Sequence, residues 1–311
     1  MSGACLACLR PSEAGHGGYH RACLRALFET DVVPAIDIEL AKLHTVGLAM
    51  AGKTSLSGVQ RKVSLGLSTE RTTLQVSIAP GRFILKPRAE TFAELPENEL
   101  TTMRLAAEVG LEVPPCALVT LKDGSTAYIV RRFDRAADHK VHQEDFCQLA
   151  QKSPKEKYDG SAELCVRVVR RYASEPGIEM LKLYRQLVFA WWTGNGDMHL
   201  KNLSMLRDDD GLIRMTPAYD LISTRLHIPE DDLALPIGGK RGGVTRRTWR
   251  ELADYAGIPR KAADRVLEDI AGRKDACTAL IDRSPLSPPL REAYRALLED
   301  RTAALVGHSP S

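Results

Sequence analysis

Hydrophobic and polar positions follow two different patterns along the chain. Between residues 54 and 131, short apolar or β-branched runs such as VSLGL, TLQVSI and RFILK are separated by Ser, Gly, Pro and charged residues, which is typical of strands. CALVTL and TAYIVRRF flank KDGS, and an Asp-Gly turn between two such runs predicts a hairpin. One helix is predicted at residues 97–111, ending near Gly110, and another short helix is expected within residues 34–50.

From about residue 142 onward, long helical patterns dominate, as in ELCVRVVRRYA and EMLKLYRQLVFAWWTG. Strands followed by helices predict the α+β fold class. We expect three domains: a small Cys/His-rich unit at 1–28, a strand-rich N-lobe at 29–140 and a helical C-lobe at 141–311.

Composition and charge limit the classes of protein to which the chain can belong. A net charge of +3 in 311 residues gives no reason to expect direct nucleic-acid binding. No apolar run approaches the roughly 20 residues that cross a bilayer, and MSGACLACLRPSE lacks the apolar core of a secretory signal. We therefore expect a cytoplasmic protein without membrane contact, whose seven cysteines are thiols or metal ligands.

The segment GNGDMHLKN at 194–202 concentrates polar side chains directly after an apolar run. Two apolar segments then flank DDDG at 208–211, which predicts a hairpin. A hairpin brings Asn202, at its entry, close to Asp220, just past its exit. Their oxygen atoms suit Mg²⁺, and the carboxylate of Asp197 can accept a hydroxyl proton. The pattern indicates phosphoryl transfer, and a solvated polar helix end is the alternative.

The run DMHLKN, followed by AYD, resembles the catalytic loop and metal-binding Asp of the HipA family of serine/threonine kinases. These are the toxins of bacterial toxin–antitoxin systems and are similar in layout to the protein-kinase fold. Further matching pieces lie in order between residues 54 and 270: SLSGVQRKVSL, FILKP, ENEL, VRRFDR, HQEDFCQL, GDMHLKN and YDLIS. The resemblance implies a two-lobed HipA-like fold that uses ATP and Mg²⁺. In its length the chain resembles the compact HipT-type kinases of three-component systems.

The resemblance also implies roles for individual residues. Asp197 corresponds to the catalytic base, with Lys201 beside it in the catalytic loop. Asn202 and Asp220 correspond to the Mg²⁺ ligands. Lys86, at the end of FILK, corresponds to the lysine that contacts the ATP phosphates, for which a compact positive charge is suited.

Two further pieces belong to the expected nucleotide site. Glu97 or Glu99 is expected to pair with Lys86 or to shape the nearby helix, and the sequence does not choose between them. VRRFDR, with Arg131 and Phe133, corresponds to the linker whose backbone meets adenine. Arg131 stands where the family pattern leads us to expect an acidic residue.

Residues 47–54, GLAMAGKT, match the phosphate-loop pattern of nucleotide triphosphatases, with Lys53 and Thr54 as its working residues. That motif requires a strand before it and a helix after it. Here a charged, helix-like segment precedes it and an alternating, strand-like segment follows it. A P-loop triphosphatase therefore stays an alternative.

The next residues, SLSG, resemble the serine-bearing loop near the ATP site of the family. Ser57 and Gly58 are expected to contact the nucleotide, and Ser55 and Ser57 match positions of autophosphorylation. A phosphate there would add negative charge beside the ATP phosphates and tune activity. An ordinary Ser/Gly turn is the other interpretation.

The N-terminus holds a Cys₃His set: Cys5 and Cys8, then His20 and Cys23, with His16 as a spare candidate. Ligand pairs two residues apart, separated by a loop, are typical of tetrahedral zinc sites. We expect zinc with a structural or docking role, because 28 residues offer little core of their own. Stray thiols in a disordered tail are the alternative.

The sequence thus predicts a Ser/Thr protein kinase of a toxin–antitoxin system that phosphorylates a serine on a protein target and itself. By resemblance the target is an aminoacyl-tRNA synthetase, and the partners are a helix-turn-helix antitoxin and a small third subunit. A small-molecule or lipid kinase with the same base and metal ligands is an alternative. A nucleotide-binding module that has lost catalysis is another, although the expected catalytic residues are all present.

Overall fold

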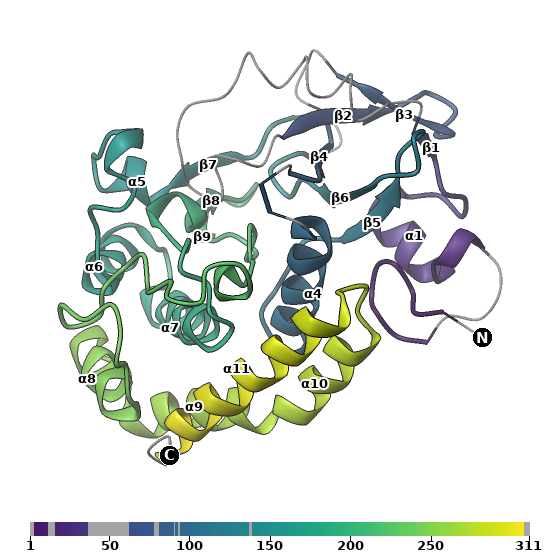
Figure 1. Ribbon diagram of the computed structural model, residues 1–311. Coiled ribbons are helices and arrows are strands. Elements are labelled where there is room, and N and C mark those ends of the chain that lie inside the picture. The colour runs from purple at the N-terminus through teal and green to yellow at the C-terminus, as the bar shows by residue number, and fades with distance from the viewer. Residues whose placement is uncertain are drawn as a thin grey trace. The chain divides into compact units, whose positions relative to one another are not determined.

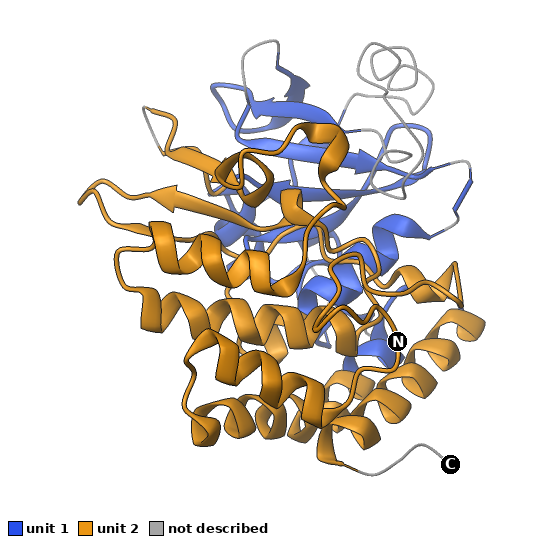
Figure 2. Cartoon of the chain, turned by 90° about the vertical axis from the view of Figure 1, so that its left-hand side faces the viewer, with its two compact units in different colours: residues 1–104, 114–132, 280–287 blue, residues 105–113, 133–279, 288–311 orange. Residues whose placement is uncertain are grey.

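The computed structural model describes residues 3–11, 16–36, 62–77, 81–89, 91–92, 94–136 and 139–307. The chain forms two compact units (Figure 2): unit 1 holds residues 1–104, 114–132 and 280–287, and unit 2 holds 105–113, 133–279 and 288–311. Unit 1 is rich in strands and unit 2 is mainly helical, so the α+β class is confirmed. None of the described helices is long and apolar enough to cross a membrane.

Unit 1 is built on a six-stranded sheet with the order β1-β3-β2-β4-β6-β5 (Figure 1). The strands predicted from VSLGL, TLQVSI and RFILK are all present, and CALVT and TAYIVR form the predicted antiparallel hairpin around the Asp-Gly turn. The strands are β1 (Ala35–Ile36), β2 (Val63–Leu67), β3 (Thr73–Val76), β4 (Phe83–Pro87), β5 (Cys116–Thr120) and β6 (Thr126–Arg131).

Only residues 34–36 of the segment in which a short helix is expected are described, and they hold a strand, so the helix stays a prediction. Ala35 and Ile36 form β1, which pairs in parallel with Thr73 and Leu74 of β3, and Ala35 N–H donates to Thr72 O at 2.7 Å. The edge of β3 thus supplies the hydrogen-bond partners of this short strand. Residues 37–50 lie outside the described part of the chain.

The two faces of the sheet carry different helices. Leu85 and Ile129 pair in register and belong to a buried core with Leu24, Leu27 and Phe28 of α1 (Arg21–Phe28). Alternate residues of a strand point to opposite faces. Lys86 and Tyr128, the next registered pair, therefore face the other way, where Lys86 contacts α4 (Leu95–Glu108). The predicted end of this helix is confirmed, since Gly110 follows it with φ +80°.

Unit 2 is organised around one buried helix, α7 (Pro176–Trp192), which is apolar around most of its circumference and packs against α6, α8, α9 and α11. Its described elements also include η3 (Pro154–Glu156), α5 (Phe146–Leu149), α6 (Ala162–Tyr172), η4 (Leu200–Asn202), η5 (Thr224–Leu226), α8 (Arg246–Ala256), α9 (Arg260–Gly272) and α11 (Pro288–Val306). A further helix, α10 (Lys274–Arg283), passes from unit 2 into unit 1, and the short η1 (His16–Gly18) precedes α1 in unit 1.

A three-stranded antiparallel sheet, β7-β8-β9, lies within the helical unit. The hairpin predicted around DDDG is confirmed: β8 (Ser204–Arg207) pairs with β9 (Ile213–Met215), and Gly211 has φ +81° in the turn. β7 (His142–Asp145) was not predicted. Its four residues, HQED, are polar and none is buried, so it has no alternation to mark it as a strand.

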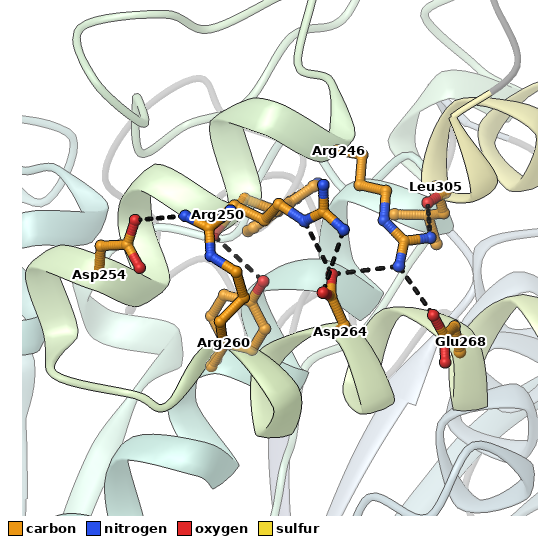
Figure 3. A network of polar contacts seen from close by, with 9 residues as sticks. Arg246, Arg250, Asp254, Arg260, Asp264, Glu268 and Leu305 are labelled. Atoms are coloured by element: carbon orange, nitrogen blue, oxygen red, sulfur yellow. Dashed lines mark hydrogen bonds and ion pairs between the residues drawn. The ribbon is translucent and has the colours of Figure 1, made fainter.

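Charged side chains connect α8, α9 and α11 (Figure 3). Arg250 binds both oxygens of Asp264 at 2.8 and 3.0 Å, while Arg246 reaches Asp264 at 3.1 Å and Glu268 at 2.8 Å. Arg246 also donates to Leu305 O at 3.1 Å. The two arginines hold the pKa of the Asp264 carboxyl below its usual value, with the hydrogen bond from Arg250 contributing most. This network links α8, α9 and α11, three of the helices that pack against α7.

Candidate active site

The segment 194–202 begins where α7 ends. Gly194 has φ +68°, and a Cβ at this position would lie 2.7 Å from Leu297 Cδ2, so glycine is required for both reasons. Asn195 N–H then donates to Ala190 O at 2.8 Å, and Gly196 N–H donates to the Thr224 hydroxyl at 2.8 Å. These bonds turn the chain sharply away from the helix and hold the following residues in place.

Asp197 is buried and held from three sides. Its backbone N–H donates to Asn195 Oδ1 at 3.0 Å, and its carbonyl accepts from Asn202 Nδ2 at 2.9 Å and from His199 N–H at 2.8 Å. The phenolic hydroxyl of Tyr158 donates a hydrogen bond to its Oδ1. A carboxylate fixed in this way can accept a proton from a hydroxyl group without first reorganising.

The β8–β9 hairpin returns the chain to this loop. Thr216 N–H donates to Ser204 O at 3.0 Å, and the Tyr219 hydroxyl donates to Lys201 O at 2.8 Å. Asp220 follows with φ +53°, a conformation uncommon for residues other than glycine. Asp220 thus directly follows Tyr219, whose side chain is hydrogen-bonded to Lys201 of the 194–202 segment.

The pKa of His199 is affected by the carboxylates of both Asp197 and Asp220. Burial lowers the pKa of its imidazole to about 4, while the charge of Asp197 and, to a smaller extent, that of Asp220 act in the opposite direction. Both carboxylates are thus close enough to act on one imidazole ring. At neutral pH the ring is uncharged and adds no positive charge beside Asp197.

Lys201 points to a partner that the sequence did not suggest. Its Nζ donates to Asp145 Oδ2 at 2.8 Å. Asp145 is also the N-cap of α5 and forms a capping box with Gln148. Asp145, the last residue of β7, therefore holds Lys201 of the 194–202 segment in place.

Unit 1 contains the other predicted charged pair. Lys86 is buried and donates a hydrogen bond to Glu99 Oε1, which is also buried. Of the two glutamates that the sequence left open, Glu99 is therefore the one that pairs with Lys86. Glu97 Oε1 instead lies 3.6 Å from a guanidinium nitrogen of Arg88. Burial raises the pKa of the Glu97 carboxyl.

Of the other predicted nucleotide contacts, the structure describes only Arg131 and Phe133. The guanidinium of Arg131 is bonded to Glu29 Oε1 and to Ala26 O at 3.2 Å, so its side chain binds the end of α1. Phe133 packs on Tyr219 with ring centroids 5.6 Å apart. Ser55, Ser57 and Gly58 lie outside the described residues, as does the phosphate-loop match with Lys53 and Thr54.

Sequence reasoning missed the segment 157–160, which packs on residues 197–200. Besides the bond from Tyr158 to Asp197, the Tyr158 ring meets the His199 ring edge-on at 5.0 Å, and Leu200 N–H donates to Lys157 O at 3.1 Å. A Cβ on Gly160 would lie 2.9 Å from Leu200. The letters KYDG carry no spacing signal that points to a loop some 40 residues later.

The predicted zinc ligands come together in unit 1. The ligand atoms of Cys5, Cys8, His20 and Cys23 all lie within 4.8 Å of one another. His16 is exposed and is not part of this group. The set is chemically suited to a thiophilic divalent ion.

The fold is similar to that of two proteins of known structure. One is HipA in the solved "Shewanella oneidensis MR-1 Toxin Antitoxin System HipA, HipB and its operator DNA complex", with a TM-score of 0.71 and 24% identity, covering 82% of this chain and 66% of that one. The other is the Helicobacter pylori proinflammatory kinase CtkA, with a TM-score of 0.55 and 16% identity, covering 74% and 90%. The fold is thus similar to that of HipA and of CtkA.

Residues 54–277 match the family described as the HipA-like C-terminal domain, and the chain belongs to this family. Among its curated relatives are "Putative kinase Y4mE" of Sinorhizobium fredii, 40% identical over 221 residues, and "Putative kinase Y4dM" of the same organism, 35% identical over 217 residues. These matches cover 66% and 65% of this chain but 51% and 53% of the relatives. The chain therefore spans about half the length of these relatives.

Proposed function

We propose that the chain is an ATP- and Mg²⁺-dependent serine/threonine protein kinase of a toxin–antitoxin system. The observation that carries the proposal is the catalytic loop of unit 2. There the buried Asp197 carboxylate is oriented by Tyr158, and Asn202 is tied to the Asp197 carbonyl. Asp220 follows a tyrosine bonded to the same loop. A base and two oxygen ligands in one rigid place are what phosphoryl transfer requires.

In the proposed reaction a serine hydroxyl oxygen forms a bond to the γ-phosphorus of ATP, and the bond from that phosphorus to the β–γ bridging oxygen breaks. The hydroxyl proton passes to Asp197, and ADP leaves with the bridging oxygen. Asn202 and Asp220 offer an amide oxygen and a carboxylate, the hard ligands that suit Mg²⁺. Bound there, the ion would neutralise charge on the phosphates.

The charged pair of unit 1 supports the same proposal. Lys86 is a buried cation held by Glu99, and a fixed lysine on a strand beside a glutamate on a helix is the pairing that protein kinases use to position ATP phosphates. In this proposal Ser57 and Gly58 contact the nucleotide, the backbone near Arg131 and Phe133 meets adenine, and Ser55 or Ser57 becomes phosphorylated.

The proposed partners are a helix-turn-helix antitoxin, a small third subunit and a protein substrate such as an aminoacyl-tRNA synthetase. Support for the antitoxin comes from the similar HipA structure, which was solved with HipB and operator DNA. The third subunit and the substrate rest on the resemblance to compact HipT-type kinases.

Mass spectrometry of the purified protein, incubated with ATP, Mg²⁺ and a cell extract, tests the proposal. We expect phosphoserine on the chain itself and on a protein in the extract, and none of either with Asp197→Asn. Phosphate found only on a metabolite or lipid would instead assign a small-molecule kinase. ATP hydrolysis that survives Asp197→Asn and is lost with Lys53→Ala would assign a P-loop triphosphatase.

A further inference from the structure

The N-terminal segment and the start of α1 bring four ligand atoms together in unit 1. Cys5 and Cys8 lie in a tight turn, while His20 and Cys23 lie at the N-cap and in the first turn of α1. Their ligand atoms lie within 4.8 Å of one another. All three cysteines are free thiols, and an odd number of thiols cannot be satisfied by disulfides alone.

The turn that carries Cys5 and Cys8 is closed by two backbone hydrogen bonds. Cys5 N–H donates to Arg10 O at 2.9 Å, and Leu9 N–H donates back to Cys5 O at 2.9 Å. Leu9 has φ +59° although it is a fully buried leucine. A β- or γ-branched side chain adopts this conformation rarely, so the local strain needs compensation from the contacts that the turn makes.

His20 is oriented as a metal ligand. Its Nε2 lies 2.9 Å from Pro11 O, and because a carbonyl only accepts, the proton is on Nε2. Nδ1 is then a lone-pair donor, and it lies 3.2 Å from Cys8 Sγ. A backbone carbonyl that fixes the tautomer of a ligating histidine is a usual feature of zinc sites. The backbone N–H of His20 also points at Cys5 Sγ, at 3.3 Å, where it would stabilise a thiolate.

We propose that Cys5, Cys8, His20 and Cys23 bind one Zn²⁺ ion in a closed tetrahedral site. With Zn–S near 2.3 Å and Zn–N near 2.0 Å, ligand atoms around a tetrahedron lie roughly 3.5–3.8 Å apart. The observed cluster needs only small side-chain shifts to reach that geometry. Four protein ligands leave no open position for substrate, so the site is structural and does not take part in phosphate transfer.

The ion would hold a cap on the edge of the six-stranded sheet. β5 is the outermost strand, and on its outer side Leu118 N–H donates to Leu6 O at 2.8 Å, while the Tyr19 hydroxyl donates to Leu118 O. Both Leu6 and Tyr19 sit beside ligands. An uncovered edge strand can pair with a strand of another chain. The zinc site would keep β5 covered and so prevent such pairing.

Metal analysis of the full-length purified protein tests this inference independently of any kinase activity. We expect about one zinc per chain, a loss of at least tenfold in bound zinc for Cys8→Ser and His20→Ala, and no change for His16→Asn. His16→Asn is the matched control, because His16 lies in the same segment but outside the cluster, and Asn tolerates its left-handed backbone.

A second readout covers variants that fail to fold. Protein reconstituted with Co²⁺ should show the intense visible bands of tetrahedral cobalt with thiolate ligands, and His20→Cys should keep both metal and bands. A strong chelator should lower the melting temperature of wild type and of His16→Asn alike. Wild-type protein without zinc, a cobalt spectrum without thiolate character, or metal lost equally with His16→Asn would overturn the site.

Discussion

The phenolic hydroxyl of Tyr158 donates its hydrogen bond to Oδ1 of Asp197, across 39 residues of sequence. The same ring supports His199 edge-on. In the proposed reaction Tyr158 is therefore a positioning residue, because its hydroxyl orients the carboxylate of Asp197.

Tyr158→Phe removes only that hydroxyl. A hydrogen bond to a charged group contributes about 1.5–3 kcal/mol, so we expect kcat for phosphate transfer to fall about 10- to 100-fold, with the KM for ATP nearly unchanged. Steady-state kinetics measure both values. Tyr172→Phe is the matched control, since its hydroxyl donates to the backbone carbonyl of Leu149 and not to Asp197. Equal losses in the two variants would show that only general stability had changed.

Gly196→Ala tests how tightly the loop is packed. A Cβ at Gly196 would lie 2.1 Å from Asp231 Oδ2 and 2.6 Å from Asp232 O. We expect the loop to shift, with a fall of 1–3 kcal/mol in the free energy of unfolding, about the cost of overpacking, and loss of most transfer activity. Urea unfolding and an activity assay measure the two effects. Gly177→Ala, in α7 with open space around it, should leave the activity unchanged and should not lower the free energy of unfolding, because alanine is the better helix former. A Gly196→Ala protein as active as wild type would contradict the packing.

The pair of Lys86 and Glu99 makes a prediction that separates stability from nucleotide binding. Removing one partner leaves the other charge buried, at a cost of about 3–5 kcal/mol, so Lys86→Met should lower the free energy of unfolding by that order. Lys86→Met combined with Glu99→Leu should recover much of it, because no unpaired charge remains. Denaturant unfolding checks this. The double variant should nevertheless bind ATP more weakly than wild type, as measured by titration calorimetry. ATP binding at the wild-type level would contradict the role of Lys86.

The network of Asp264 with Arg246 and Arg250 predicts a pH dependence. The folded-state pKa of Asp264 is lowered, so its carboxylate contributes stability above its unfolded pKa, and this contribution is lost as pH falls through the folded value. Asp264→Asn should therefore be less stable than wild type at pH 7, with the difference shrinking below the ordinary Asp value of 3.8. Unfolding at pH 7 and pH 3 measures it. A difference that stays constant with pH would contradict the electrostatic account.

Local signals predicted much of the fold and part of the site. The Asp-Gly turns at 123–124 and 210–211 mark hairpins because both residues favour tight turns, and the two hairpins are confirmed. The helix before Gly110 is confirmed for the same kind of reason. The division into domains at residues 28 and 140 and the roles of the individual site residues stay predictions.

Features that depend on distant contacts were not visible in the sequence. Glu99 rather than Glu97 pairs with Lys86 because the phase of α4 against β4 decides which carboxylate faces the sheet. β1 exists because β3 offers it an edge. Tyr158 reaches Asp197 because residues 157–160 pack on residues 199–200. Periodicity describes each element by itself and carries no information on which elements meet.

The most direct test of the central claim compares Asp197→Asn with wild type for two quantities measured on the same preparation: binding of ATP with Mg²⁺, and the rate of γ-phosphate transfer. The account predicts unchanged nucleotide binding and a transfer rate lower by about 10²–10⁴, the contribution of a positioned base. Transfer at the wild-type rate would contradict it.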